Sequence, residues 1–383
     1  MNRIQTLWRN IFPHASPIPA GVYSYDPAND SEIPFRMHLR IEPDGNGIVI
    51  LNAHTVLHLN STAAEYAWHM VNKSSEDETI RNITRRYNIN RQQVLNDRNE
   101  LIEKLESFLA SPDLDPETFL DFGRQEPYSK KLSAPYRLDC ALTYQTGDGH
   151  DENAPADRIK RELLTDEWKK ILEKAWNAGI PHIIFTGGEP TTRPDLVELI
   201  NYASQLGQVT GLLTDGLRLS ETEYLHSLLQ SGLDHMMITH DIQEDQSWES
   251  IRDVLSEDIF LTVHLTLDRK NLKSLTSAIT RLAAMGVKSL SLSSADPDLA
   301  DELKNLHQSV ADSGLTLEWD LPVPYSSFHP VSIEIKDHET PPQGAGIAWL
   351  YVEPDGDVLP AQGITKVMGN LVTDPWVDIW EKS

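Results

Sequence analysis

The chain has 383 residues, with 58 Asp and Glu against 33 Lys and Arg, so its formal net charge is -25 at pH 7. This charge disfavours nucleic acid and anionic membrane surfaces as partners, because both are negatively charged. A single cysteine, Cys140, excludes a disulfide within these residues and any zinc site or iron–sulfur cluster that needs several thiolates from them. No stretch reaches the ~20 apolar residues of a membrane span. We therefore expect a soluble cytoplasmic protein with no membrane partner.

The first part of the chain predicts a small α+β domain over residues 36–110, after an N-terminal segment over 1–35. Apolar and polar residues alternate over 37–59 and are interrupted by turn residues, which predicts a meander of three strands. Asn60 and Ser75 are typical helix N-caps, and a third helix is expected from Asn90 to about Leu109. A proline-containing linker over 111–134 follows.

From residue 135 to about 330 the pattern changes to strands that alternate with helices. Several of the helical segments end at a glycine, which is typical of a C-terminal cap. Six or seven such units indicate α/β architecture with a parallel sheet, and we expect a partial (β/α)6-type barrel rather than the eight strands of a full one. The predicted strands cover residues 137–144, 182–186, 209–214, 235–239, 260–267, 289–292 and 316–319.

The final segment, residues 331–383, loses this alternation. It contains a hairpin-like stretch over 351–359 and a short tryptophan-rich helix over 374–380. We treat it as a C-terminal extension of the barrel.

The most specific motif is Thr186-Gly187-Gly188-Glu189-Pro190, at the end of the second predicted strand. Ligands of parallel sheets gather at the carboxyl ends of the strands. Two glycines allow backbone to approach a ligand closely, and the glutamate can accept a hydrogen bond from an ammonium group. The alternative is that the glycines only form a tight turn between strand and helix.

This motif resembles the GGEP sequence of the radical S-adenosylmethionine (radical SAM) enzymes, which binds the amino group of S-adenosylmethionine (SAM). Segments 138–144, 164–168, 193–196 and 214–216 are similar to the same family, and 351–360, 369–371 and 376–380 resemble its SPASM extension. Residues 36–110 resemble the winged-helix-like PqqD peptide-recognition domain. With the polar residues near the strand ends, the resemblance implies a SAM pocket lined by Thr186, Gly187, Gly188, Glu189, Pro190, Thr214, Asp215, His240 and His264.

The chain departs from the family where a [4Fe–4S] cluster would be bound. The family's C-x-x-x-C-x-x-C motif aligns with Thr146, His150 and Asn153, and Ala361 replaces a further cysteine in the extension. Thr and Asn are not cluster ligands, and one His cannot replace three thiolates. We read Cys140 as a buried small residue. We therefore expect no iron–sulfur cluster and no radical chemistry, although SAM binding stays open as the cofactor function.

Two functions follow from this departure. In the first, the protein is a non-catalytic pseudoenzyme, a scaffold for a peptide or protein or a partner of an active radical SAM enzyme in peptide modification. In the second, it is a cluster-independent enzyme that binds SAM or another small ligand at the GGEP pocket. We expect the first, because no nucleophile, base and orienting group can be named together.

Other sites are weaker candidates. A metal site of His240, His264 and nearby carboxylates is conceivable at the strand ends, but no tight ligand spacing supports it, and we expect no metal. No G-x-S-x-G motif indicates a serine hydrolase. The PqqD resemblance implies that a leader peptide adds as a strand beside Thr55, Val56, Leu57, His58 and Leu59. The alternative is that this domain only supports the barrel.

Overall fold

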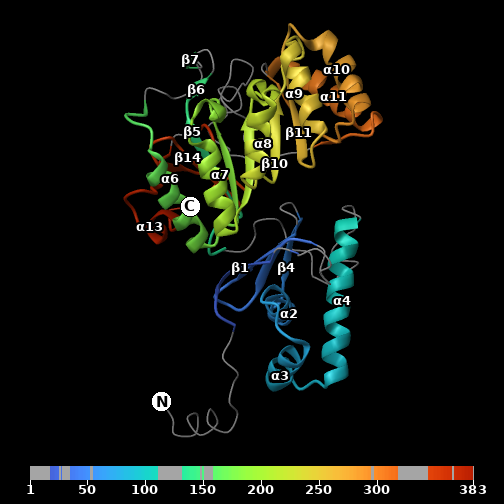
Figure 1. The fold of residues 1–383 in the computed structure, drawn as a ribbon, viewed down its shortest axis with the longest axis vertical. Helices are drawn as coiled ribbons and strands as arrows, with labels where there is room; N and C mark the ends of the chain where they lie inside the picture. Colours follow the sequence, from blue (N-terminus) through green and yellow to red (C-terminus); the bar gives the residue numbers. More distant parts are fainter. Residues whose placement is uncertain are drawn as a thin grey trace. The chain divides into compact units, whose positions relative to one another are not determined.

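The computed structural model describes residues 18–25, 27, 35–51, 55–110, 132–146, 149–150, 158–294, 297–317, 344–364 and 366–382. The chain divides into two compact units, Met1–Ser133 and Ala134–Ser383 (Figure 1). Within the described ranges, no helix is long and apolar enough to cross a membrane.

The first unit contains a four-stranded antiparallel sheet in the order β1-β2-β3-β4. The sequence predicts the last three strands but not β1. The residues of β1 are mostly half-buried, without the alternation of buried and exposed residues that is typical of a strand with one solvent-facing side. The sheet therefore begins before residue 36. The strands are β1 (Gly21–Tyr25), β2 (Met37–Ile41), β3 (Gly47–Leu51) and β4 (Thr55–Leu59).

Three helices follow this sheet in the chain: α2 (Ser61–Val71), α3 (Glu76–Arg86) and α4 (Arg91–Ala110). Both predicted N-caps are confirmed. The Asn60 side chain accepts from the Ala63 N–H, and the Ser75 side chain accepts from the Glu78 N–H. Apolar side chains of the sheet and all three helices form one core, so this unit buries its own hydrophobic surface.

The second unit is mixed α/β and contains a ten-stranded sheet in the order β13-β12-β11-β10-β9-β8-β5-β14-β15-β16. Neighbouring strands from β13 to β14 are parallel, whereas β15 and β16 are antiparallel additions. The parallel strands are β5 (Arg137–Thr143), β8 (His182–Gly187), β9 (Val209–Thr214), β10 (His235–Thr239), β11 (Phe260–Leu267), β12 (Ser289–Ser294), β13 (Thr316–Leu317) and β14 (Trp349–Val352), followed by β15 (Asp357–Leu359) and β16 (Gly369–Asn370).

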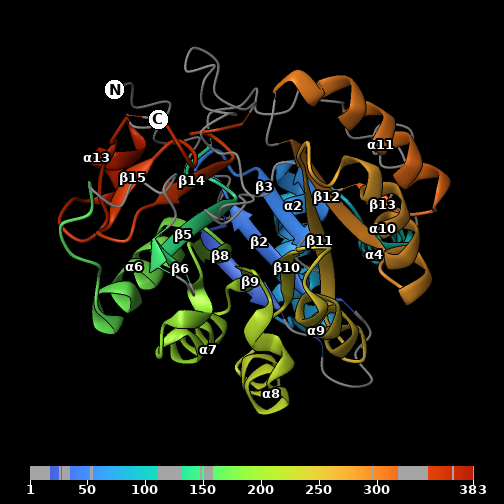
Figure 2. The same ribbon diagram turned by 90° about the horizontal axis from the view of Figure 1, so that it is seen from above.

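Helices follow one another along one side of this sheet (Figure 2). They are α6 (Thr165–Ala178), α7 (Leu196–Leu206), α8 (Thr222–Gln230), α9 (Asp245–Leu255), α10 (Leu272–Met285) and α11 (Ala300–Asp312), with the short α13 (Trp376–Trp380) near the chain end. Glycines with positive φ, such as Gly179 and Gly207, form the predicted C-caps of α6 and α7.

The two faces of the sheet carry different side chains, because successive residues of a strand point to opposite sides. Leu138, Cys140 and Phe185 belong to the large core that the helices complete. Ile184, Leu213 and Met237 form a separate small cluster on the opposite side, which we call the second face. Polar residues of β11 and β12 continue the alternation on this second face, and they include His264, Ser291 and Ser293.

Candidate functional site

The Gly-Gly turn at the end of β8 lies directly against the carboxyl end of β5. The Gly188 N–H donates to the Thr143 carbonyl at 2.7 Å, and the Glu189 N–H donates to the Gln145 carbonyl at 2.7 Å. A Cβ atom on Gly187 would lie 2.1 Å from the Thr143 oxygen, and one on Gly188 would lie 2.3 Å from the Gln145 oxygen. A larger residue at either position would clash with the backbone of residues 143–145, so this turn requires both glycines.

The Glu189 carboxylate is held by three donors at the ends of β8 and β9. Its Oε1 accepts from the Thr191 N–H at 2.9 Å and from the Thr214 hydroxyl at 2.8 Å, while its Oε2 accepts from the Asp215 N–H at 2.7 Å. Glu189 also caps the short helix η2 (Pro190–Thr192). The side chain is only 4% exposed, so the structure brings Glu189, Thr214 and Asp215 together as the sequence predicts.

The electrostatics of this turn favour a positively charged ligand. Burial and the neighbouring Asp215 carboxylate raise the pKa of Glu189, against the effect of its hydrogen-bond donors. An ammonium group beside the two carboxylates would favour their charged forms. On the same strand, the fully buried Thr186 hydroxyl has no hydrogen-bond partner among the described residues. These residues fit the amino acid end of SAM.

His264 lies in the middle of β11 and has its own buried network. Its Nδ1 is 3.0 Å from the Ser291 hydroxyl, and its Nε2 is 3.0 Å from the Ser293 hydroxyl and 3.1 Å from that of Thr266. Burial lowers the pKa of His264 to about 3, so the ring is neutral at pH 7. The hydroxyls satisfy both ring nitrogens.

His240 follows β10 and contacts helix α9. Its Nδ1 is 2.6 Å from the Ser247 hydroxyl, and its ring packs edge-on against Trp248. The Nε2 atom is buried and has no hydrogen-bond partner in the described part of the chain. Burial, with a smaller effect from Arg281, lowers the pKa of His240 to about 4. The side chains of the two histidines thus hydrogen-bond to hydroxyls of α9, β11 and β12.

The residues at the predicted cluster positions do not fit an iron–sulfur cluster. Thr146 lies in β6 (Gln145–Thr146), which pairs with β7 (Gly149–His150) in a two-stranded hairpin. Asn153 lies outside the described residues. Cys140 is buried on the helix side of β5, where burial and then Asp139 raise its pKa. The chain's one thiol is therefore a protonated core residue.

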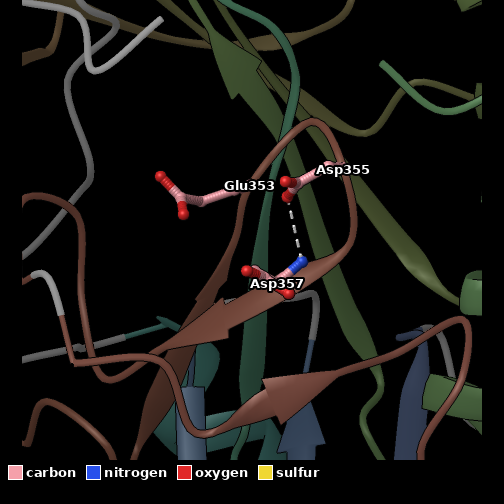
Figure 3. A group of neighbouring side chains, drawn as sticks. All are labelled: Glu353, Asp355 and Asp357. Atoms are coloured by element: carbon pink, nitrogen blue, oxygen red, sulfur yellow. Dashed lines mark hydrogen bonds between the residues drawn. The ribbon is translucent and has the colours of Figure 1, made fainter. Parts of the chain in front are cut away.

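A group of three carboxylates lies on the hairpin between β14 and β15 (Figure 3). Oxygen atoms of Glu353, Asp355 and Asp357 lie within 4.8 Å of one another. The most buried member, Glu353, accepts from the Tyr144 hydroxyl at 3.0 Å and forms an ion pair with Arg158. The guanidinium already supplies a counter-charge, so we assign no metal to this group.

The strand predicted to bind a peptide is β4, at one end of the antiparallel sheet. It pairs with β3 in the described structure. Leu57 and Leu59 are buried in the core of the first unit, while His58 is exposed. The side chains of Thr55 and Val56 lie outside the described residues. The position of β4 is compatible with addition of a further strand.

Arg193 is a residue near the site that the sequence analysis did not single out as functional. Its guanidinium binds Asp195 through two hydrogen bonds and also donates to the Leu142 carbonyl at the end of β5. The available signal was an arginine two residues before an aspartate, directly after the GGEP turn. That spacing allows the pair, but the backbone contact depends on the tertiary structure.

Each of the two units contains a segment that matches a known protein family. Residues 140–280 match the Radical SAM superfamily, and residues 47–107 match coenzyme PQQ synthesis protein D (PqqD). Together with the relatives described next, these matches support a radical SAM protein with a PqqD-like domain.

The curated relatives include proteins named PqqA peptide cyclases. The PqqA peptide cyclase of Bradyrhizobium diazoefficiens is 36% identical over 137 residues, which are 32% of this chain and 36% of the relative. The chain thus spans about a third of that relative's length. The PqqA peptide cyclase of Streptomyces rochei is 26% identical over 262 residues, covering 60% of this chain and 70% of the relative.

Streptococcus suis SuiB bound to S-adenosylmethionine has the same fold. The TM-score is 0.56 at 14% identity, and the match covers 91% of this chain and 87% of SuiB. At this identity, the likeness concerns the fold.

These comparisons correct the expectation of a non-catalytic pseudoenzyme. The expectation of a scaffold or partner without activity is wrong, because the curated relatives are named peptide cyclases and point to a catalytic enzyme. The error came from equating loss of cluster cysteines with loss of all function. The Glu189 turn does not depend on those cysteines for its structure, since its carboxylate is bound by Thr191, Thr214 and Asp215.

Proposed function

We propose that this protein is an enzyme that binds SAM at the carboxyl ends of β8 and β9 and modifies a peptide. The observation that carries the proposal is the buried Glu189 carboxylate, placed beside the Asp215 carboxylate within the segment that matches the radical SAM superfamily. A buried carboxylate beside a second, half-buried acidic side chain is costly to keep charged. The ammonium group of SAM would favour the charged form of Glu189.

The residues of the turn have distinct roles in this proposal. Glu189 and Asp215 attract and orient the ammonium group, and the Thr191 N–H and Thr214 hydroxyl fix the Glu189 carboxylate in place. Gly187 and Gly188 hold the turn against β5. Thr186 offers a hydroxyl without a hydrogen-bond partner among the described residues, while His240 and His264 remain proposed residues of the same pocket. Bound SAM supplies an activated sulfonium centre.

The peptide binds the first unit in this proposal. It adds as a further strand along β4, with main-chain hydrogen bonds for affinity and neighbouring side chains for specificity. The match to PqqD over residues 47–107 supports this placement, because it includes β4 and the helices that follow. The net charge of -25 favours a peptide that is not strongly acidic.

The finer organisation belongs to the same proposal. The first domain, residues 36–110, is winged-helix-like, and residues 135–330 form a partial barrel after the linker. Residues 331–383 are a SPASM-like extension. The antiparallel pairing of β14, β15 and β16 supports an extension added to the parallel sheet.

The test is calorimetric titration of SAM into the wild-type chain and into Asp215→Asn. Asparagine keeps the side-chain oxygen that accepts from the Leu217 N–H, so the turn is preserved. The variant loses one negative charge beside the ammonium group, and we expect its affinity for SAM to fall by about tenfold. Its unfolding free energy should stay equal or rise, because repulsion with Glu189 is removed.

Asp44→Asn is the matched control. Asp44 accepts from the Asn46 N–H in the same kind of turn, but it lies in the first unit. This variant should bind SAM like wild type. Absence of SAM binding to wild type, or equal affinity in Asp215→Asn, would contradict the proposal.

A further inference from the structure

The carboxyl end of β5 is closed by the side chain of Glu162, which lies in the segment before α6. Its Oε1 accepts from the Thr143 hydroxyl at 2.6 Å and from the Tyr144 N–H at 3.2 Å. The Thr143 hydroxyl in turn accepts from the Gln145 N–H at 3.0 Å. Thr143 and Gln145 also provide the carbonyls to which the Gly-Gly turn is bonded. Glu162 therefore fixes the backbone against which the turn rests.

Arg193 connects the same strand end to two further segments. Its guanidinium donates to the Leu142 carbonyl at 3.1 Å and to the Leu163 carbonyl at 3.2 Å. It also makes two hydrogen bonds to Asp195, at 2.9 and 2.8 Å, and lies 3.8 Å from the Glu162 carboxylate. The N–H groups of the planar guanidinium point in fixed directions. Arg193 therefore fixes the positions of the Leu142 carbonyl, the Leu163 carbonyl and Asp195 relative to one another.

Asp195 extends this connection to helix α6. Its carboxylate accepts from the Thr165 hydroxyl at 2.7 Å. Burial acts to raise the pKa of Asp195, but the hydrogen bonds from Arg193 and Thr165 outweigh it and lower the pKa. The carboxylate is therefore charged at neutral pH. We call Glu162, Thr165, Arg193 and Asp195 the β5 clamp.

The β5 clamp binds the end of the strand after which the cluster motif of the family aligns. The segment directly after it, at Thr146, turns into the β6–β7 hairpin. The one cysteine, Cys140, belongs to the core on the helix side of β5. A cluster is held by several thiolates, and neither this hairpin nor the clamp contains one.

We propose that the β5 clamp positions the Gly-Gly turn in this protein without an iron–sulfur cluster. This inference deepens the proposed function, because the clamp holds one wall of the proposed SAM site. Glu162 and Arg193 are positioning residues that act through the backbone of β5 and of the turn. The tests below do not use SAM, so their failure is distinguishable from failure of the proposed function.

The first test measures cluster uptake by the full chain. The protein is incubated anaerobically with ferrous iron, sulfide and a thiol reductant and is then desalted. We expect no stoichiometric iron or sulfide and no charge-transfer absorbance of a thiolate-held cluster. Four irons and four sulfides retained per chain, with that absorbance, would overturn the inference.

The second test measures the β5 clamp through amide hydrogen exchange at residues 186–189. Glu162→Ala removes the acceptor for the Thr143 hydroxyl and the Tyr144 N–H, and we expect about tenfold faster exchange across the turn. Glu162→Gln keeps a carbonyl oxygen that can accept both bonds. We expect this conservative variant to restore slow exchange.

Glu198→Ala is the control for removal of an acidic side chain. Glu198 is 57% exposed on α7 and pairs with Lys169 outside the clamp. Its removal should leave exchange at the turn unchanged. Equal exchange in Glu162→Ala and wild type, or equal acceleration in Glu198→Ala, would overturn the role of the clamp.

Discussion

Gly188 tests the steric requirement of the Gly-Gly turn without a contribution from a left-handed backbone. Its φ is outside the left-handed region, so alanine at this position is limited by space alone, with the added Cβ 2.3 Å from the Gln145 carbonyl oxygen. The neighbour is backbone that the β5 clamp fixes, and it cannot move cheaply. We expect Gly188→Ala to lower the unfolding free energy by about 3 kcal/mol or more, as measured by urea unfolding.

Gly314→Ala separates this steric cost from the cost of backbone strain. Gly314 has φ +71° and no other atom within 4 Å of an added Cβ, so we expect a loss of only about 1 to 2 kcal/mol. A Gly188→Ala variant that is as stable as Gly314→Ala would mean that the contact between the turn and β5 is looser than described.

The lowered pKa of His264 makes the unfolding free energy of the protein depend on pH. Its pKa is about 3 in the folded chain, whereas an unfolded histidine titrates near ~6.5. The unfolded state therefore binds more protons between these values, and stability falls as the pH is lowered from 6.5. The contribution has a limiting slope of about 1.4 kcal/mol per pH unit. Stability at high pH does not depend on this group's charge.

His264→Gln tests this origin of acid sensitivity. Glutamine keeps polar atoms toward Ser291 and Ser293 but does not titrate. Urea unfolding between pH 4.5 and 8 should show a flatter pH dependence for the variant than for wild type. Parallel curves for both proteins would assign the acid sensitivity to other groups.

At the scale of elements, β4 and β1 offer a direct comparison, because they stand at the two ends of the same sheet. A peptide that adds along β4 should slow amide exchange at residues 55–59 and leave residues 21–25 unchanged. The probe is a PqqA peptide, the substrate named for the curated relatives. Protection of β1, or of neither strand, would contradict the proposed peptide site.

Local elements could be predicted from the sequence, whereas pairings between distant segments could not. The caps Asn60 and Ser75 and the glycines that end helices act over a few residues. By contrast, β14 pairs in parallel with β5, about two hundred residues earlier in the chain, and nothing in either strand specifies its partner. The contact of Glu162 with Thr143 also arises only once α6 and β5 are packed.

The same distinction holds within the candidate site. The GGEP motif correctly places Glu189 with Thr214 and Asp215, because both segments end adjacent parallel strands. His240 follows β10 and His264 lies within β11, and each is bound by a hydroxyl of a neighbouring element. The position of a residue along its strand predicts how close it lies to the carboxyl edge of the sheet. It does not predict which group a polar side chain binds.

At the scale of the whole molecule, the proposed function combines two units with separate hydrophobic cores. One matches PqqD and contains the proposed peptide strand; the other matches the radical SAM superfamily and contains the Glu189 turn. Neither match by itself predicts a peptide-modifying enzyme. The two matches occur in one chain, and the relatives of this chain include PqqA peptide cyclases. Both observations support that function.

The most direct measurement of the central claim is a crystal structure of the full chain grown with SAM and without added iron. The account predicts SAM at the carboxyl ends of β8 and β9, with its ammonium group against Glu189 and Asp215 and the β5 clamp unchanged. SAM bound elsewhere, or a Glu189 turn without SAM at a saturating concentration, would contradict it.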